Sequence, residues 1–116
     1  MKGMKIESVR DLKDVVAVMH DSEFNEKDYG FKPEKKMFFL ESRAFRSQEH
    51  LRLELYNIEE YRPAKNEEKI WQGKGIAGVF NYIRIRKHGL KLTLVSQDLR
   101  IVMILSKLEG ELTRDK

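Results

Sequence analysis

Apolar and polar residues alternate through much of this chain, and a period of two is typical of β-strands with one buried face. The alternation is clearest in residues 49–58, where one face carries Leu51, Leu53 and Leu55 and the other carries Arg52, Glu54 and Tyr56. Residues 35–45 have a similar composition and are rich in apolar and aromatic side chains. The pattern therefore predicts a strand in each of these segments.

Residues 80–95 predict a β-hairpin. The side chains that share one face are Ile83 and Ile85 on the first strand and Leu90, Leu92 and Leu94 on the second. The pair His88-Gly89 lies at the reversal, where glycine adopts the positive φ of a tight turn without strain. Across the predicted strands, we expect the apolar face of the sheet to consist of Leu51, Leu53, Leu55, Ile83, Ile85, Leu92, Leu94 and Met103.

Two further segments complete the strand pattern. The unbroken apolar run Ile101–Leu105 predicts a central strand that is covered on both faces. Residues 61–69 are mostly polar and contain Pro63, so they predict a loop.

One segment near the N-terminus follows the helical period instead. Val9, Leu12, Val16 and Met19 recur at helical spacing, which predicts a helix over residues 9–19. Ser8 precedes this segment, and an acidic residue stands three positions later, as in a capping box.

These elements together predict the fold class. We expect a single α+β domain over residues 1–116, mostly antiparallel β, with about six strands in a half-barrel or sandwich and one N-terminal helix. Cysteine is absent, which removes disulfides, thiolate metal sites and a cysteine nucleophile and is typical of a reducing compartment. The first residues contain no apolar segment of signal-peptide length, and no apolar run is long enough to span a bilayer. We therefore expect a cytoplasmic protein without membrane contact.

The distribution of charge singles out the predicted hairpin. The chain carries a formal net charge of +4, and 36% of its residues are charged, a proportion typical of proteins from hot environments. Between Lys69 and Gln97 there are basic residues but no acidic ones. Alternation places a basic set on the polar face of the hairpin, namely Tyr82, Arg84, Arg86, His88 and Lys91, with Thr93 beside them. This face would suit an anionic partner, or it is an ordinary solvated strand face.

The stretch from Gly73 to Gly78 has the spacing Gly-x-Gly-x-x-Gly of a dinucleotide-binding turn. That turn requires a helix that begins at its last glycine, within a parallel sheet. The segment after Gly78 has a period of two, so we expect a strand there and no bound cofactor. The glycines are then expected to form a turn and a bulge that lead into the hairpin, or to allow a close approach of another backbone segment.

Residues His20, Asp21, Ser22 and Glu23 could support metal- or His-dependent hydrolysis, because their side chains include a base, carboxylates and a hydroxyl. Neighbouring residues point in different directions, however, and no further histidine has ligand spacing to them. We therefore expect Asp21 or Ser22 to end the helix and begin the first strand. No catalytic, cofactor-binding or metal site is predicted.

The order of features also resembles several small prokaryotic domain families that have an N-terminal His-Asp-Ser/Ala element. The match is carried by His20, Asp21 and Ser22 at the end of the helix, followed by an apolar residue at Phe24 and successive antiparallel strands. Some members of these families are thought to be immunity proteins against delivered toxins. The resemblance implies a binding domain and assigns no active site to these residues.

Three functional hypotheses follow. The first is a non-catalytic interaction domain that binds a protein with an acidic surface. The alternative is nucleic-acid binding through the basic hairpin Tyr82–Lys91, where cations follow a phosphate backbone and Tyr82 stacks on a base. The third is a metal- or His-dependent hydrolase at His20–Glu23.

Overall fold

The structure is a computed structural model that describes residues 2–19, 22–24, 26–44, 47–65, 77–86, 89–96 and 99–115, with only the backbone described for residues 2, 16, 26, 65, 77–86, 89, 95, 96 and 99. Within these ranges it contains one α-helix and ten strands, and every strand pairing is antiparallel. The predicted α+β class with mostly antiparallel strands is confirmed. The described strands outnumber the six expected. The additional ones are short strands near the N-terminus and a C-terminal strand, in which apolar and polar residues do not alternate clearly.

The larger sheet has six strands in the order β1-β10-β5-β4-β2, with β3 also paired to β4. Its strands are β1 (Lys2–Ile6), β2 (Ser22–Glu23), β3 (Tyr29–Lys32), β4 (Met37–Ala44), β5 (His50–Leu55) and β10 (Gly110–Asp115). The predicted strands at residues 35–45 and 49–58 correspond to β4 and β5. Short 3₁₀ turns, η1 (Glu26–Asp28) and η2 (Pro33–Lys35), flank β3.

The smaller sheet has four strands in the order β6-β9-β8-β7. Its strands are β6 (Ile58–Lys65), β7 (Ala77–Arg86), β8 (Gly89–Ser96) and β9 (Leu99–Leu105). β7 and β8 form the predicted hairpin, with Arg86 paired to Gly89 at its closed end. β7 and β6 are the two edges of this sheet.

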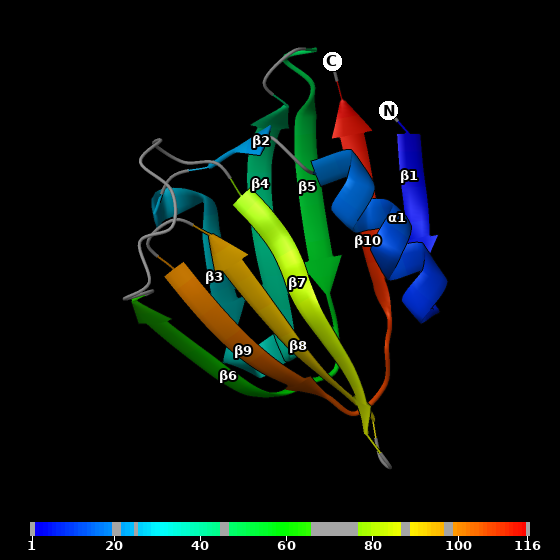
Figure 1. Cartoon of the computed structure of the whole chain (residues 1–116), viewed down its shortest axis with the longest axis vertical. Helices are drawn as coiled ribbons and strands as arrows, with labels where there is room; N and C mark the ends of the chain where they lie inside the picture. The colour runs from blue at the N-terminus through cyan, green and yellow to red at the C-terminus, as the bar shows by residue number, and fades with distance from the viewer. Residues whose placement is uncertain are drawn as a thin grey trace.

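The two sheets form separate layers, and the helix completes the second layer. In Figure 1, strands β7, β8 and β9 lie in front of the larger sheet, and α1 (Val9–Met19) lies in front of β10. The helix is also a neighbour of β7 and β1. It therefore covers the part of the larger sheet that lies beyond β7.

Both sheets contribute inward-facing side chains to one hydrophobic core. Among the residues predicted for the apolar face, those that are fully buried are Leu51, Leu53, Leu55, Leu92, Leu94 and Met103. The side chains of Ile83 and Ile85 lie outside the described part, although their backbone positions pair with Leu92 and Leu90. Period-two alternation therefore identified the core face correctly wherever the side chains are described.

The helix begins and ends as the sequence predicts. Asp11 Oδ2 accepts hydrogen bonds from the backbone N–H groups of Glu7 (3.0 Å) and Ser8 (3.2 Å), and Ser8 Oγ accepts one from Asp11 N–H (3.2 Å). This reciprocal arrangement satisfies N–H groups that have no partner within the helix. These hydrogen bonds to the carboxylate lower the pKa of Asp11. Leu12 and Met19 are fully buried on the inner side of the helix.

The prediction of a polar loop at residues 61–69 is wrong for its first part. Residues 61–65 belong to β6, and Pro63 pairs with Ile101 of β9. Proline has no N–H to donate, so it is tolerated in a strand only where that position needs no donor, as on a sheet edge. β6 is such an edge strand.

A β-bulge near the start of β6 decides which of its side chains face inward. Ile58 pairs with Leu105 and Glu60 pairs with Ile104, so Glu59 is an additional residue between them. The bulge allows both Ile58 and Tyr61 to turn toward the core, while Glu60 remains exposed.

Two buried serines allow a direct test of polar burial. Ser22 Oγ donates a 2.7 Å hydrogen bond to the carbonyl oxygen of Met19, whereas Ser42 Oγ, on the inner face of β4, has no hydrogen-bond partner among the described residues. Ser22→Ala should lower the free energy of unfolding by about 1 kcal/mol. Ser42→Ala should leave it unchanged or raise it, because an unsatisfied hydroxyl already costs about 1–3 kcal/mol. Urea unfolding of both variants makes the comparison, and equal losses would contradict this assignment.

Tyr61 offers a second test of the core. Its ring stacks on Phe31 with 4.8 Å between centroids, and burial, aided by nearby Tyr29, raises the pKa of Tyr61 from 10.0 to about 12. The folded protein holds this proton more tightly than the unfolded chain, so the associated stability is complete below pH 10 and is lost as the pH rises toward 12. Tyr61→Phe should therefore lose less stability than the wild type over this interval. Thermal unfolding at successive pH values measures the difference, and identical slopes would refute it.

Candidate functional site

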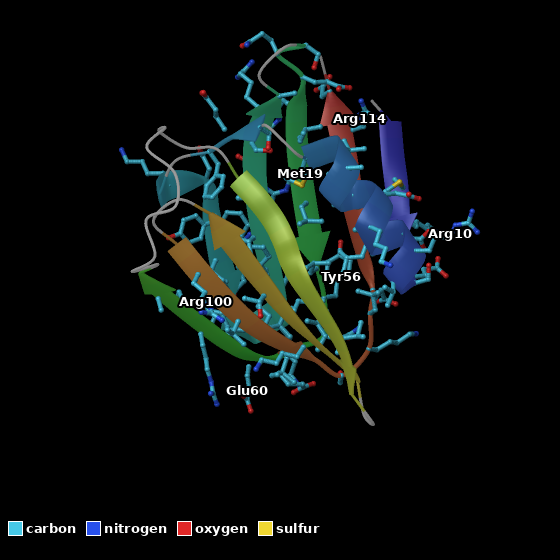
Figure 2. The ribbon with its side chains drawn as sticks, viewed as in Figure 1. Arg10, Met19, Tyr56, Glu60, Arg100 and Arg114 are labelled. Atoms are coloured by element: carbon cyan, nitrogen blue, oxygen red, sulfur yellow. The ribbon has the colours of Figure 1, made fainter. Side chains whose placement is uncertain are left out.

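The candidate site is the outer face of the four-stranded sheet, on the side away from the core. Its described side chains alternate along the strands with those that face the core, and they are Glu60, Arg62, Ala64, Lys91, Thr93, Arg100, Val102 and Ile104. Figure 2 labels two of them, Glu60 on β6 and Arg100 on β9, in the lower part of the view. We refer to this set as the outer face.

Cross-strand register arranges the outer face in rows. In the first row Glu60 of β6 pairs with Ile104 of β9, and Ile104 pairs with Lys91 of β8. In the second row the corresponding positions are Arg62, Val102 and Thr93. Register partners in a sheet project from the same face, so the members of each row lie side by side.

The hairpin residues predicted to bind an anionic partner extend these rows onto β7. Arg84 pairs with Lys91, Tyr82 pairs with Thr93, and Arg86 pairs with Gly89 at the end of the hairpin. The side chains of these three β7 residues lie outside the described part, and His88 lies outside the described residues altogether. The register therefore brings the backbone positions of the predicted set together, and Lys91 is the member whose side chain is described.

The centre of the outer face is aliphatic. Val102 and Ile104 are half-buried, whereas Ile101 and Met103 on the opposite side of β9 are fully buried. The prediction that β9 is central is confirmed, but the prediction that it is covered on both faces is wrong. Its outer side is only partly covered, because the larger sheet packs against the inner side.

The composition of the outer face could not be read from the sequence. A run of five apolar residues, Ile101–Leu105, gives no sign of which face reaches solvent. Glu60 and Arg62 were missed because Pro63 suggested a loop in place of β6. Thr93 was expected to be exposed beside Lys91, but it is buried, with a relative exposure of 6%.

Arg52 of the larger sheet is a cation with two carboxylate partners. On its outward side Arg52 Nη1 lies 2.5 Å from Glu41 Oε1, and Arg52 Nε lies 3.3 Å from Glu54 Oε1. The guanidinium also lies 5.2 Å from the centroid of the Phe39 ring. Partial burial alone would lower the pKa of Arg52, but the hydrogen bonds to both glutamates outweigh it, so the pKa is raised. The charge of Arg52 is thus neutralised within the sheet.

Lys91 of β8, on the outer face, is not neutralised in this way by the described residues. It is half-buried, and no carboxylate of the described residues forms an ion pair with it. Its register neighbours are Ile104 and Arg84. Glu60, on the far side of Ile104, instead forms a 2.8 Å ion pair with Arg62 of its own strand. A cation beside aliphatic side chains and without a counter-charge favours binding of an anionic group.

Of residues 20–23, which the sequence offers as a hydrolytic site, the structure describes Ser22 and Glu23. Ser22 is fully buried, and its hydroxyl is engaged by the carbonyl of Met19, so it closes the helix and begins β2 as predicted. β2 is not the first strand, because β1 precedes the helix. Glu23 is exposed, while His20 and Asp21 lie outside the described residues. Among the described residues, no three His, Asp or Glu side chains are grouped closely enough to hold a metal ion.

The glycine motif also leads into a strand. Gly78 lies in β7 and pairs with Val95, where a dinucleotide fold would begin a helix. The register shifts between Gly78 and Tyr82, so the strand has a bulge or irregularity directly after the last glycine of the motif. Gly73 and Gly75 lie outside the described residues.

Comparison with known proteins adds no assignment. No protein-family model matches the chain, and neither the curated proteins nor the solved structures contain a match. In the described part of the chain, the helix is too short and too polar to cross a membrane. The function must therefore be inferred from the geometry of the site.

The contrast between the two sheets yields a stability prediction. Lys91→Gln should change the free energy of unfolding by less than about 0.5 kcal/mol, because no ion pair is lost. Arg52→Gln should cost about 1–2 kcal/mol, because two charge-assisted hydrogen bonds and the contact with Phe39 are removed. Denaturant unfolding of both variants tests this. A loss at Lys91 as large as that at Arg52 would show that Lys91 has a structural role.

Proposed function

We propose that this protein is a non-catalytic interaction domain whose outer face binds a protein with an acidic surface. The observation that supports this most directly is the position of Lys91, a half-buried cation without an ion pair among the described residues, beside the half-buried Ile104. Protein interfaces commonly combine an aliphatic centre with charges at the rim. A carboxylate of the partner would provide the counter-charge for Lys91.

A protein partner suits the described side chains better than a nucleic acid does. Sheets that bind single-stranded RNA or DNA stack bases on several aromatic side chains and surround them with cations. The described side chains of the outer face include no aromatic ring, and Glu60 would repel phosphate. The half-buried aliphatic residues Val102 and Ile104 would instead pack against apolar side chains of a protein.

We also propose that the protein acts in the cytoplasm. The sequence contains no cysteine, which suits a reducing compartment. The numerous charged residues would keep the remaining surface soluble.

Affinity capture with a matched control tests the interaction. A tagged wild-type protein, Lys91→Glu and Lys13→Glu are used as bait in extract from the source organism. Lys13 is exposed on α1 and is not part of the outer face, and its substitution changes the net charge equally. We expect the wild type and Lys13→Glu to capture the same protein, and Lys91→Glu to lose it, because like charges would then face each other.

The same variants distinguish the alternative functions. A partner retained equally by Lys91→Glu would refute the assignment of the outer face. A labelled oligonucleotide that binds the wild type with strong salt dependence, and binds Lys91→Glu more weakly, would instead support nucleic-acid binding.

A further inference from the structure

Two cations of the outer face have no ion pair with a carboxylate among the described residues. They are Lys91 on β8, which is half-buried, and Arg100 on β9, which is exposed. The third cation, Arg62 on β6, is held at 2.8 Å by Glu60 of the same strand. The uncompensated positive charge of the described side chains therefore lies toward β8 and at the Arg100 end of β9.

The strand register fixes the spacing of these two cations. Arg100 pairs with Val95, which is four residues along β8 from Lys91. A strand advances about 3.4 Å per residue and neighbouring strands lie about 4.8 Å apart, so the two Cα positions are about 14 Å apart. Val102 and Ile104 occupy the next two outward positions of β9 after Arg100, and they lie about 7 Å from each other.

The aliphatic part of the outer face is only one strand wide. Val102 and Ile104 both belong to β9, and their register neighbours on β6 are charged. On β8 their neighbours are Thr93 and Lys91. A second sheet packed face to face would need apolar side chains on several adjacent strands. A single amphipathic helix presents a narrow apolar stripe with charged residues along its flanks, so it suits this surface better.

From this layout we infer that the acidic partner of the outer face contributes an amphipathic α-helix, which lies along β9 with carboxylates against Lys91 and Arg100. The inference rests on the proposed function, since both require the outer face to bind protein, and it specifies the form of the acidic segment. Residues four apart on a helix are about 6 Å apart along its axis, close to the spacing of Val102 and Ile104. Apolar residues at helix positions i and i+4 would thus pack on this pair.

The same helix geometry places the carboxylates. The residue one turn after the apolar pair reaches Arg100, and the residue one turn before it is within reach of Lys91, which lies in the row of Ile104. The expected motif is an acid at i−4 and at i+7, about 16 Å apart along the axis. Lysine and arginine side chains are long and flexible enough to bridge the difference from the spacing of the cations. An acid over β6 would instead meet Glu60 and be repelled.

The described helix of this chain does not provide the motif. The apolar side of α1 is buried in the core, and its exposed side chains include Arg10, Lys13 and Asp14. A second copy would therefore bring cations as well as a carboxylate to the outer face. We assign the acidic helix to a different protein.

Peptides with exchanged charges test the inference. The probe is a fluorescently labelled, alanine-rich peptide of about 18 residues, long enough to form a helix, with leucine at i and i+4 and glutamate at i−4 and i+7. Fluorescence anisotropy measures its dissociation constant for the wild type and for Lys91→Glu/Arg100→Glu. The double variant should bind at least about tenfold more weakly, because like charges would face each other. A second peptide, with lysine at both acidic positions, should show the reverse preference.

Two controls separate net charge and helical form from the charge pattern. Arg10→Glu/Lys13→Glu makes the same change in net charge at exposed positions of α1, so it should bind both peptides as the wild type does. Proline midway between the two leucines disrupts the peptide helix and should weaken binding to the wild type at least about tenfold. Circular dichroism and thermal unfolding check that both double variants are folded.

Three results would overturn the inference. They are a wild type that does not bind the acidic peptide at millimolar concentration, equal binding of the proline peptide, and equal binding of the acidic peptide by Lys91→Glu/Arg100→Glu. In each case, capture of a protein from extract that depends on Lys91 would leave the proposed function standing. A labelled oligonucleotide that displaces the peptide and binds the wild type with strong salt dependence would instead count against both proposals. Loss of both the peptide and the captured protein would refute both.

Discussion

The apolar inner face of the six-stranded sheet has to be shielded from water across its whole width. The arrangement of the second sheet and of the helix follows from this requirement. The four-stranded sheet covers part of it, and α1 covers the part beyond β7. Leu12 and Met19 of the helix and the leucines of β5 thereby become inaccessible to water, which provides most of the driving force for folding. The same alternation that turns Leu92 and Met103 inward leaves Lys91 and Ile104 on the opposite side. The surface available for binding is thus a geometric consequence of the core.

Much of this architecture is encoded locally and could be predicted. The cap formed by Ser8 and Asp11 depends on residues only three positions apart, so the helix boundaries were predicted correctly. The leucines of β5 occupy alternate positions, so only one orientation of the strand turns all of them toward the core. The hairpin of β7 and β8 was equally evident, because its apolar residues alternate on both sides of the reversal.

The remaining features depend on contacts between distant segments. Pro63 is a loop former in most contexts, and only the position of β6 on a sheet edge allows it within a strand. The exposure of Ile104 depends on which layer lies on each side of β9, which a continuous apolar run does not reveal. Pairing of Glu60, Ile104 and Lys91 in one row depends on the bulge at Glu59, since a register one residue different would turn Glu60 inward. The candidate site could therefore be predicted only in part, through the basic character of the hairpin.

The position of β10 has a consequence for how the chain acquires its structure. β10 lies between β1 and β5, so the first strand joins the larger sheet only through the last one. During synthesis, β1 therefore has no partner in the sheet until the C-terminal strand has emerged from the ribosome. Pairings between such distant segments carry a high loop-closure cost and slow the search for the native state. The hydrogen-bonding edge of β5 that β10 will occupy stays unpaired throughout this period, and unpaired strand edges make partly folded chains prone to aggregate.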